Sequence, residues 1–168
     1  MIVIADTTPI NYLVLIGEQE LLPALFGQVI IPEAVFRELL ATATPQVVRQ
    51  WLSNRPQWLE IRKATMAPDT SLSHLDDGER EAIQLAEELG ADLLLADEKA
   101  ARREAVRRQL ATSGTLGVLD RAAEKGLVDF SQAFQRLKQT SFHMSPTVER
   151  FFLARDAQRK ARRKEPQA

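Results

Sequence analysis

Short apolar runs alternate with longer amphipathic segments along most of the chain. The runs lack the polar–apolar alternation of half-exposed strands, which is typical of strands buried on both faces of a parallel sheet. Strands are predicted at Met1–Ile4, Val29–Ile31, Trp58–Ile61, Leu93–Ala96 and Ala111–Ser113. The third of these is expected at an edge of the sheet.

Helical segments fill the intervals between these strands. They are predicted at Pro9–Ile16, Glu18–Leu25, Pro32–Ala43, Gln46–Leu52, Gly78–Leu89, Glu98–Leu110 and Thr115–Lys125, followed by about 131–140 and 146–164. Gly27, Gly90 and Gly126 are expected to end three of them, because glycine readily forms a helix C-cap. The connection at 64–75 is polar and has no period.

The helix at Gly78–Leu89 has the clearest pattern. Glu79, Ile83 and Ala86 form one row along it, which we expect to be buried, with Glu79 as its acidic top. Glu81, Gln84 and Glu88 form a second row, which we expect to face solvent.

Alternation of strands and helices predicts an α/β fold. We expect an α/β/α sandwich with a central, mainly parallel sheet of about five strands and a C-terminal helical extension. Residues 1–168 are expected to form a single domain, with an α/β core at 1–128 and the extension at 129–168.

The composition excludes several kinds of bond and metal site. The 168 residues include no cysteine, which excludes disulfides, thiolate zinc sites and cysteine nucleophiles, and the two histidines have no metal-ligand spacing. No apolar run is long enough to span a bilayer, and no signal core follows a basic start, so a cytoplasmic location is expected.

The net charge of −1 hides a strong asymmetry. Residues 1–98 hold 6 basic and 16 acidic residues, whereas residues 99–168 hold 16 basic and 7 acidic ones. Such halves suggest a polyanion partner, a cation site, or both. Solvated faces, or charges that match across an oligomer, are the alternative.

Four carboxylates occupy comparable places in the pattern. Asp6 and Asp97 each directly follow a buried strand, and parallel strands deliver both to the same edge of the sheet. Glu79 lies in the first turn of a helix that starts from that edge. Glu38 lies further into its helix, between core positions, and is expected at the boundary of the sheet.

Each acid also has a structural interpretation. Asp6 and Asp97 could cap the helices that follow them. Asp76 and Glu79 have the spacing of a capping box. Glu38 could pair with an arginine.

Several carboxylates at one partly buried edge would take up protons or bind a cation. Without histidine or cysteine, the cation should prefer oxygen ligands, as Mg²⁺ and Mn²⁺ do. Metal-dependent phosphodiester hydrolysis fits this cluster together with a basic second half. Arg102, Arg103, Arg107 and Arg108 would neutralise phosphates, and the basic tail from Arg155 to Lys164 would bind RNA or a partner.

Five segments, in order, resemble the PIN-domain ribonucleases, specifically the prokaryotic group similar to VapC-type toxins. They are Ile4–Ile10, Val35–Leu39, Leu75–Ile83, Ala96–Arg102 and Gly114–Leu119. The resemblance covers about residues 2–128, and the trailing helices also fit this group. The Asp76-Asp77-Gly78-Glu79 run departs from the simpler third-acid segment of typical VapC proteins, so Asp76 or Asp77 could share or replace the role of Glu79.

The resemblance implies a Rossmann-like fold and an endoribonuclease that uses Mg²⁺ or Mn²⁺ to cleave single-stranded or structured RNA. By position it makes Asp6, Glu38, Glu79 and Asp97 both the metal ligands and the catalytic acids, with Thr7, Asp76 and Thr115 in support. It also implies a toxin of a toxin–antitoxin pair, inhibited by a protein antitoxin, and a homodimer. Arg102 and Arg103 are the expected RNA contacts.

Two other classes of function are alternatives to this one. A phospho-acceptor module would need a lysine near the fifth strand, where the chain has Gly114-Thr115. A non-catalytic PIN-like RNA-binding or protein-interaction module is the stronger alternative, and the presence of all four acids counts against it.

Overall fold

The computed structural model describes residues 1–164 as two compact units, the first formed by residues 1–115 and the second beginning at residue 116. The last four residues of the expected extension, 165–168, lie outside the described residues. That the two units make up a single domain stays a prediction.

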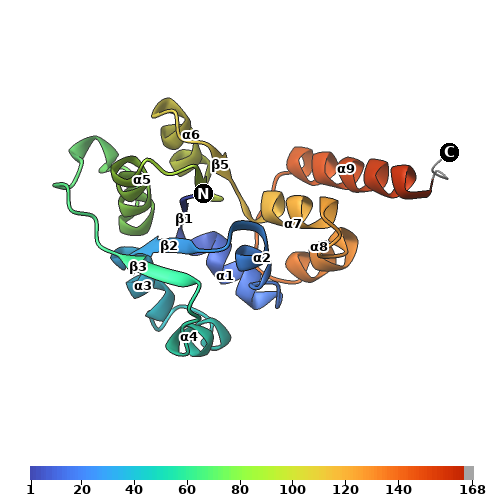
Figure 1. The fold of residues 1–168 in the computed structure, drawn as a ribbon, viewed down its shortest axis with the longest axis horizontal. Helices are drawn as coiled ribbons and strands as arrows, with labels where there is room; N and C mark the ends of the chain where they lie inside the picture. Colours follow the sequence, from blue (N-terminus) through green and yellow to red (C-terminus); the bar gives the residue numbers. More distant parts are fainter. Residues whose placement is uncertain (165–168) are drawn as a thin grey trace. The chain divides into compact units, whose positions relative to one another are not determined.

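A sheet of five parallel strands forms the centre of the first unit (Figure 1). Its order is β3-β2-β1-β4-β5. The strands are β1 (Val3–Ala5), β2 (Val29–Pro32), β3 (Leu59–Arg62), β4 (Leu93–Leu95) and β5 (Thr112–Ser113). The predicted parallel α/β sandwich is confirmed, and β3 lies at an edge as expected.

Helices cover both faces of this sheet. α1 (Thr7–Leu15), α2 (Leu21–Phe26), α3 (Glu33–Leu40) and α4 (Gln46–Ser53) lie along the chain between β1 and β3, whereas α5 (Asp77–Leu89) and α6 (Lys99–Arg107) flank β4. Figure 1 shows α5 and α6 on one side of the sheet and α3 and α4 on the other. Ile4, Ile30 and Leu94 of neighbouring strands pack with Ile83 of α5 and Ala105 of α6 in one buried cluster.

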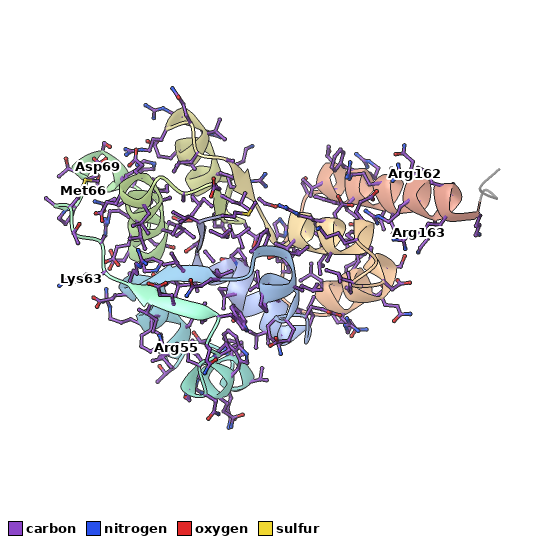
Figure 2. The ribbon with its side chains drawn as sticks, in the orientation of Figure 1. Arg55, Lys63, Met66, Asp69, Arg162 and Arg163 are labelled. Carbon is purple, nitrogen blue, oxygen red and sulfur yellow. The ribbon has the colours of Figure 1, made fainter. Side chains whose placement is uncertain are left out.

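The connection between β3 and α5 covers part of α5, contrary to the sequence-based expectation. Gln84, expected to face solvent, is 3% exposed, and its amide donates to the Ala67 carbonyl at 2.9 Å. The Glu88 carboxylate accepts the backbone N–H groups of Thr65 and Met66. Met66 is labelled on this connection in Figure 2. The expected solvent row was therefore wrong at Gln84, because an aperiodic loop packs over it.

The second unit contains most of α7 (Thr115–Glu124), with α8 (Phe130–Lys138) and α9 (Pro146–Lys164), close to the expected bounds. The rings of Phe130 on α8 and Phe152 on α9 stack with centroids 6.3 Å apart. Ser131 of α8 donates to Asp156 of α9 at 2.9 Å. No helix within residues 1–164 has both the length and the apolar character needed to cross a membrane.

Candidate metal centre

Asp6 follows β1 directly, and β1 lies between β2 and β4. The chain runs from β1 to β2 on one side and returns to β4 on the other, which makes this strand end the switch point where α/β sheets bind ligands. The Asp6 N–H donates to the Leu95 carbonyl at 2.9 Å, which fixes the backbone there. Asp6 is 2% exposed and is the N-cap residue of α1, but its side chain makes no capping hydrogen bond to that helix.

The Oδ1 atom of Asp6 is buried and has no hydrogen-bond partner. A buried carboxylate oxygen without a donor costs free energy, on the order of 1–3 kcal/mol. A cation or a proton bound at this atom would remove that cost.

Glu38 reaches the same place from α3. One of its oxygens accepts the Thr7 hydroxyl, and the other accepts the Gly78 N–H at 2.9 Å. These donors hold the carboxylate in place without an opposing full charge. A Cβ atom on Gly78 would lie 2.5 Å from Glu38 Oε2, so this approach requires glycine at position 78. Sequence reasoning missed this role of Gly78, although a glycine in a helical first turn beside an acid was a visible signal.

Asp76 completes the group. One carboxylate oxygen from each of Asp6, Glu38 and Asp76 lies within 4.8 Å of the others. Asp76 is exposed and is the N-cap of α5, where its Oδ1 accepts the Glu79 N–H at 2.8 Å. The structure therefore brings together two of the four predicted metal acids and one of the supporting residues.

Glu79 is buried at 7% exposure, as its row on α5 predicted. Its carboxylate accepts the Asp76 N–H at 3.2 Å, so the capping box that the spacing suggested is present. Although Glu79 takes part in the capping box, it still belongs to the acidic group, because its charge raises the pKa of Asp6. Asp77, the other alternative third acid, pairs with Arg80 at the surface.

Asp97 lies two residues after β4 and is half-buried. The Thr115 N–H donates to its Oδ1 at 2.8 Å and the Thr115 hydroxyl to its Oδ2 at 2.7 Å. Glu98, rather than Asp97, is the N-cap of α6. Thr115 thus holds Asp97 by two hydrogen bonds, and its role at a metal site stays a prediction. A Cβ atom on Gly114 would collide with Asp97 Oδ1, which is a second close approach that sequence reasoning missed.

Burial and like charge shape the electrostatics of the site. Burial raises the pKa of Asp6 well above its usual value, and the charges of Asp76, Glu79 and Glu38 raise it further. Burial and Asp76 raise the pKa of Glu79. Burial also raises the pKa of Asp97, against the hydrogen bonds from Thr115. A bound cation would stabilise the charged form of carboxylates whose pKa is raised by burial and like charge.

The donors fit a small divalent ion. Every candidate ligand atom is a carboxylate oxygen, the type that Mg²⁺ and Mn²⁺ prefer. The unpartnered Asp6 oxygen points the same way. The residues are therefore compatible with a divalent metal.

The arginines in α6 and at its C-cap differ in their surroundings. Arg102 and Arg103 are exposed, as an RNA contact requires. The side chain of Arg108 is 17% exposed and pairs with Glu104 of α6, Glu87 of α5 and Asp69 of the segment between β3 and α5. It therefore links these three segments rather than facing a ligand. Asp69 is labelled in Figure 2.

A family model described as a PIN domain matches residues 2–158 of the chain. Among curated proteins, none matches.

Proposed function

The chain belongs to the PIN-domain family, and we propose that it is an Mg²⁺- or Mn²⁺-dependent endoribonuclease acting on single-stranded or structured RNA. One observation carries the proposal. Asp6 has a buried oxygen without a partner and shares a cluster of carboxylate oxygens with Glu38 and Asp76 at the switch point of the sheet.

In this proposal Asp6, Glu38 and Asp76 hold the metal, with Glu79 and Asp97 as the further ligands and catalytic acids of the site. When bound, a divalent ion there would supply a Lewis acid and a water of lowered pKa for phosphodiester hydrolysis. Thr7 and Gly78 orient the Glu38 carboxylate. Arg102 and Arg103 neutralise phosphates of the RNA.

The first experiment is cleavage of a 5′-labelled single-stranded RNA by the purified protein. We expect cleavage with Mn²⁺ or Mg²⁺, none with EDTA, and none with Asp6→Asn. Asp77→Asn is the matched control, because it makes the same chemical change on an exposed acid outside the cluster. Cleavage that persists in EDTA and in Asp6→Asn would exclude the metal-nuclease mechanism. If no RNA is cleaved while RNA still binds, the non-catalytic RNA-binding module becomes the better description.

A second experiment identifies the third acid. Asn is as good an N-cap as Asp, and Gln can replace Glu in a capping box, so Asp76→Asn and Glu79→Gln both preserve the start of α5. Any loss of Mn²⁺ affinity, measured by calorimetric titration, then reports on ligation rather than folding. We expect Asp76→Asn to lose more affinity than Glu79→Gln; the reverse order would make Glu79, rather than Asp76, the stronger ligand.

We also propose that the chain is the toxin of a toxin–antitoxin pair, inhibited by a protein antitoxin, and that it acts as a homodimer in the cytoplasm. The support is the motif resemblance to VapC-like proteins. Induced expression in a bacterial host should arrest growth, and expression of Asp6→Asn should not. Light scattering of the purified protein tests the dimer.

A further inference from the structure

One face of α9 carries a stripe of side chains that the proposed metal site does not use. Phe151, Arg155, Gln158 and Arg162 are spaced by four, three and four residues, which aligns them on one side of the helix. Arg162 is also labelled in Figure 2.

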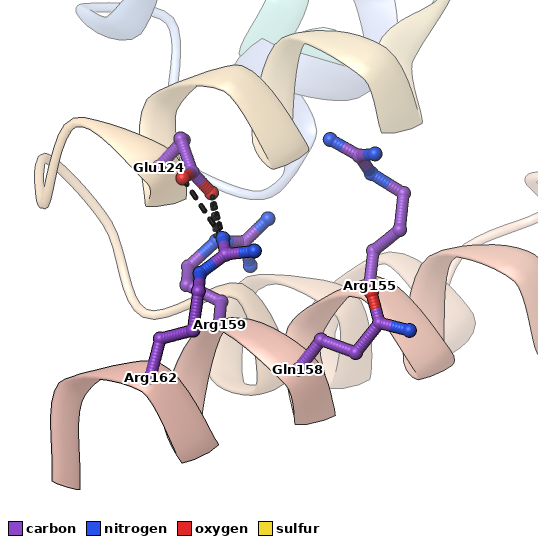
Figure 3. Close-up of a pocket in the computed structure, with 5 residues that line it drawn as sticks. All are labelled: Glu124, Arg155, Gln158, Arg159 and Arg162. Atoms are coloured by element: carbon purple, nitrogen blue, oxygen red, sulfur yellow. Dashed lines mark hydrogen bonds and ion pairs between the residues drawn. The ribbon is translucent and has the colours of Figure 1, made fainter. Parts of the chain in front are cut away.

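A pocket of about 270 Å³ lies along this stripe, entirely within the second unit. It is lined by Arg155, Gln158, Arg159 and Arg162 of α9 and by Glu124 of α7. Figure 3 shows Arg155 and Arg162 rising from α9 on either side of Gln158. Since one water takes up about 30 Å³, the pocket admits a polyatomic ion. Arg155 and Arg162 keep exposed cationic side chains at its rim, which favours an anion.

The three arginines have different roles. Arg159 is buried, with a side chain 4% exposed, and pairs with Asp120, Glu124 and Asp156, so it belongs to the structure of the unit. The side chains of Arg155 and Arg162 are 47% and 62% exposed. Each pairs with an acid that Arg159 also holds, Asp120 for Arg155 and Glu124 for Arg162. Their exposed guanidinium groups remain accessible to a ligand.

Phe151 adds an aromatic surface at one end of the stripe. It is 56% exposed, and the guanidinium carbon of Arg155 lies 5.8 Å from the centroid of its ring. An edge contact with Phe152, at 5.2 Å between centroids, holds the ring in place. Exposed rings beside cations are the surface on which single-stranded nucleic acids stack their bases.

We propose that this stripe is a subsite for single-stranded RNA, in which a backbone phosphate occupies the arginine pocket and a neighbouring base stacks on Phe151. Arginine guanidinium groups bind phosphate oxygens in pairs, and Gln158 adds a neutral donor. An acidic peptide would use the same cations but would have no need of the aromatic face. The inference rests on the proposed function in taking RNA as the substrate.

The test measures binding without cleavage. Asp6→Asn protein in EDTA is titrated against a fluorescent single-stranded oligouridylate, followed by anisotropy at several salt concentrations. The double variant Arg155→Gln/Arg162→Gln leaves Asp120 and Glu124 paired with Arg159, so it should fold normally. Arg150→Gln is the matched control, since Arg150 is an exposed cation of the same helix about 100° off the stripe. Truncation of the tail would be uninformative, because it would also remove Asp156 and Arg159.

We expect the double variant to bind more weakly and to flatten the slope of log affinity against log salt by about 0.7 to 1.4, the value for one or two phosphate contacts. Phe151→Leu should lower affinity about fivefold or more and leave the slope unchanged. Arg150→Gln should change neither.

Equal effects of the double variant and Arg150→Gln, or no RNA binding at all, would overturn the subsite. So would a polyglutamate peptide that binds through Arg155 and Arg162 while Phe151→Leu has no effect, because the surface would then recognise an acidic protein. Failure of the nuclease proposal would give a different result. In that case wild-type protein fails to cleave RNA with Mn²⁺ while the binding results above still hold.

Discussion

Replacing Asp6 by asparagine is expected to stabilise the metal-free protein while abolishing its metal response. The buried Oδ1 atom has no partner, and Glu38, Asp76 and Glu79 add like charge around it. A neutral amide removes the repulsion and offers N–H groups to the neighbouring carboxylates. Relief of one unsatisfied buried group amounts to about 1–3 kcal/mol. At about 2–4 °C per kcal/mol for a chain of this size, the melting temperature should rise by about 2–12 °C.

Thermal melts in EDTA and with Mn²⁺ measure this directly. A metal at 100 times its dissociation constant stabilises the wild type by about 2.7 kcal/mol, so Mn²⁺ should close or reverse the gap, whereas the variant should not respond. Asp77→Asn should respond to Mn²⁺ like the wild type. A variant that melts below the wild type in EDTA would refute the reasoning, because Asp6 would then be stabilising the fold rather than waiting for a ligand.

The pH dependence of the stability difference between Asp6→Asn and the wild type has a definite sign. The pKa of Asp6 is raised in the folded protein above its value of 3.8 in a model peptide. The folded state therefore binds the proton more tightly than the unfolded chain, and the penalty of the charged group is absent below about pH 3.8. This penalty grows as pH rises and is complete above the folded-state pKa of Asp6. The advantage of Asp6→Asn over the wild type in EDTA should accordingly grow with rising pH; a constant difference would contradict the assignment.

Three further predictions concern the support of the site and of the fold. Gly78→Ala should leave stability nearly unchanged, because the preference of a helical position for alanine, about 0.5–1 kcal/mol, offsets the cost of displacing Glu38. It should lower cleavage by about 100-fold, since the added Cβ would lie 2.5 Å from Glu38 Oε2 and move that carboxylate. Unchanged cleavage would show that the close approach of Gly78 and Glu38 does not matter for activity. Thr115→Val should weaken Mn²⁺ binding while Thr115→Ser retains it, because only serine keeps the hydroxyl that holds Asp97. Arg108→Met should destabilise the first unit by about 3 kcal/mol in urea unfolding, since it leaves three acids without their common partner; a loss below about 1 kcal/mol would show a solvated surface pair.

Most of the fold could be predicted from local patterns. The end of each buried strand predicted the positions of Asp6 and Asp97, because parallel strands share a direction. The helical period predicted the burial of Glu79. Gly27 and Gly90 end their helices with φ of +76° and +58°, as the helix-stop pattern indicated.

The remaining features depend on contacts between distant segments. Gln84 is buried by a loop that has no period, so no pattern on α5 could reveal it. Arg155 pairs with Asp120, 35 residues earlier, and a run of basic residues does not show which of its members already have partners. The choice between Asp76 and Glu79 is also tertiary. Both satisfy the same capping box, and only the position of Glu38 shows which one meets the cluster.

The hydrogen bonds that hold Glu38 determine when the acidic group can assemble during folding. Thr7 is 31 residues before it and Gly78 is 40 residues after it, so the group depends on long-range contacts that form only after these loops close. A nascent chain that has not yet emerged as far as the start of α5 lacks Asp76 and the Gly78 N–H. Under the proposed function, such a chain would have no metal site, and the protein would become a nuclease only after α5, in its third crossover, had folded.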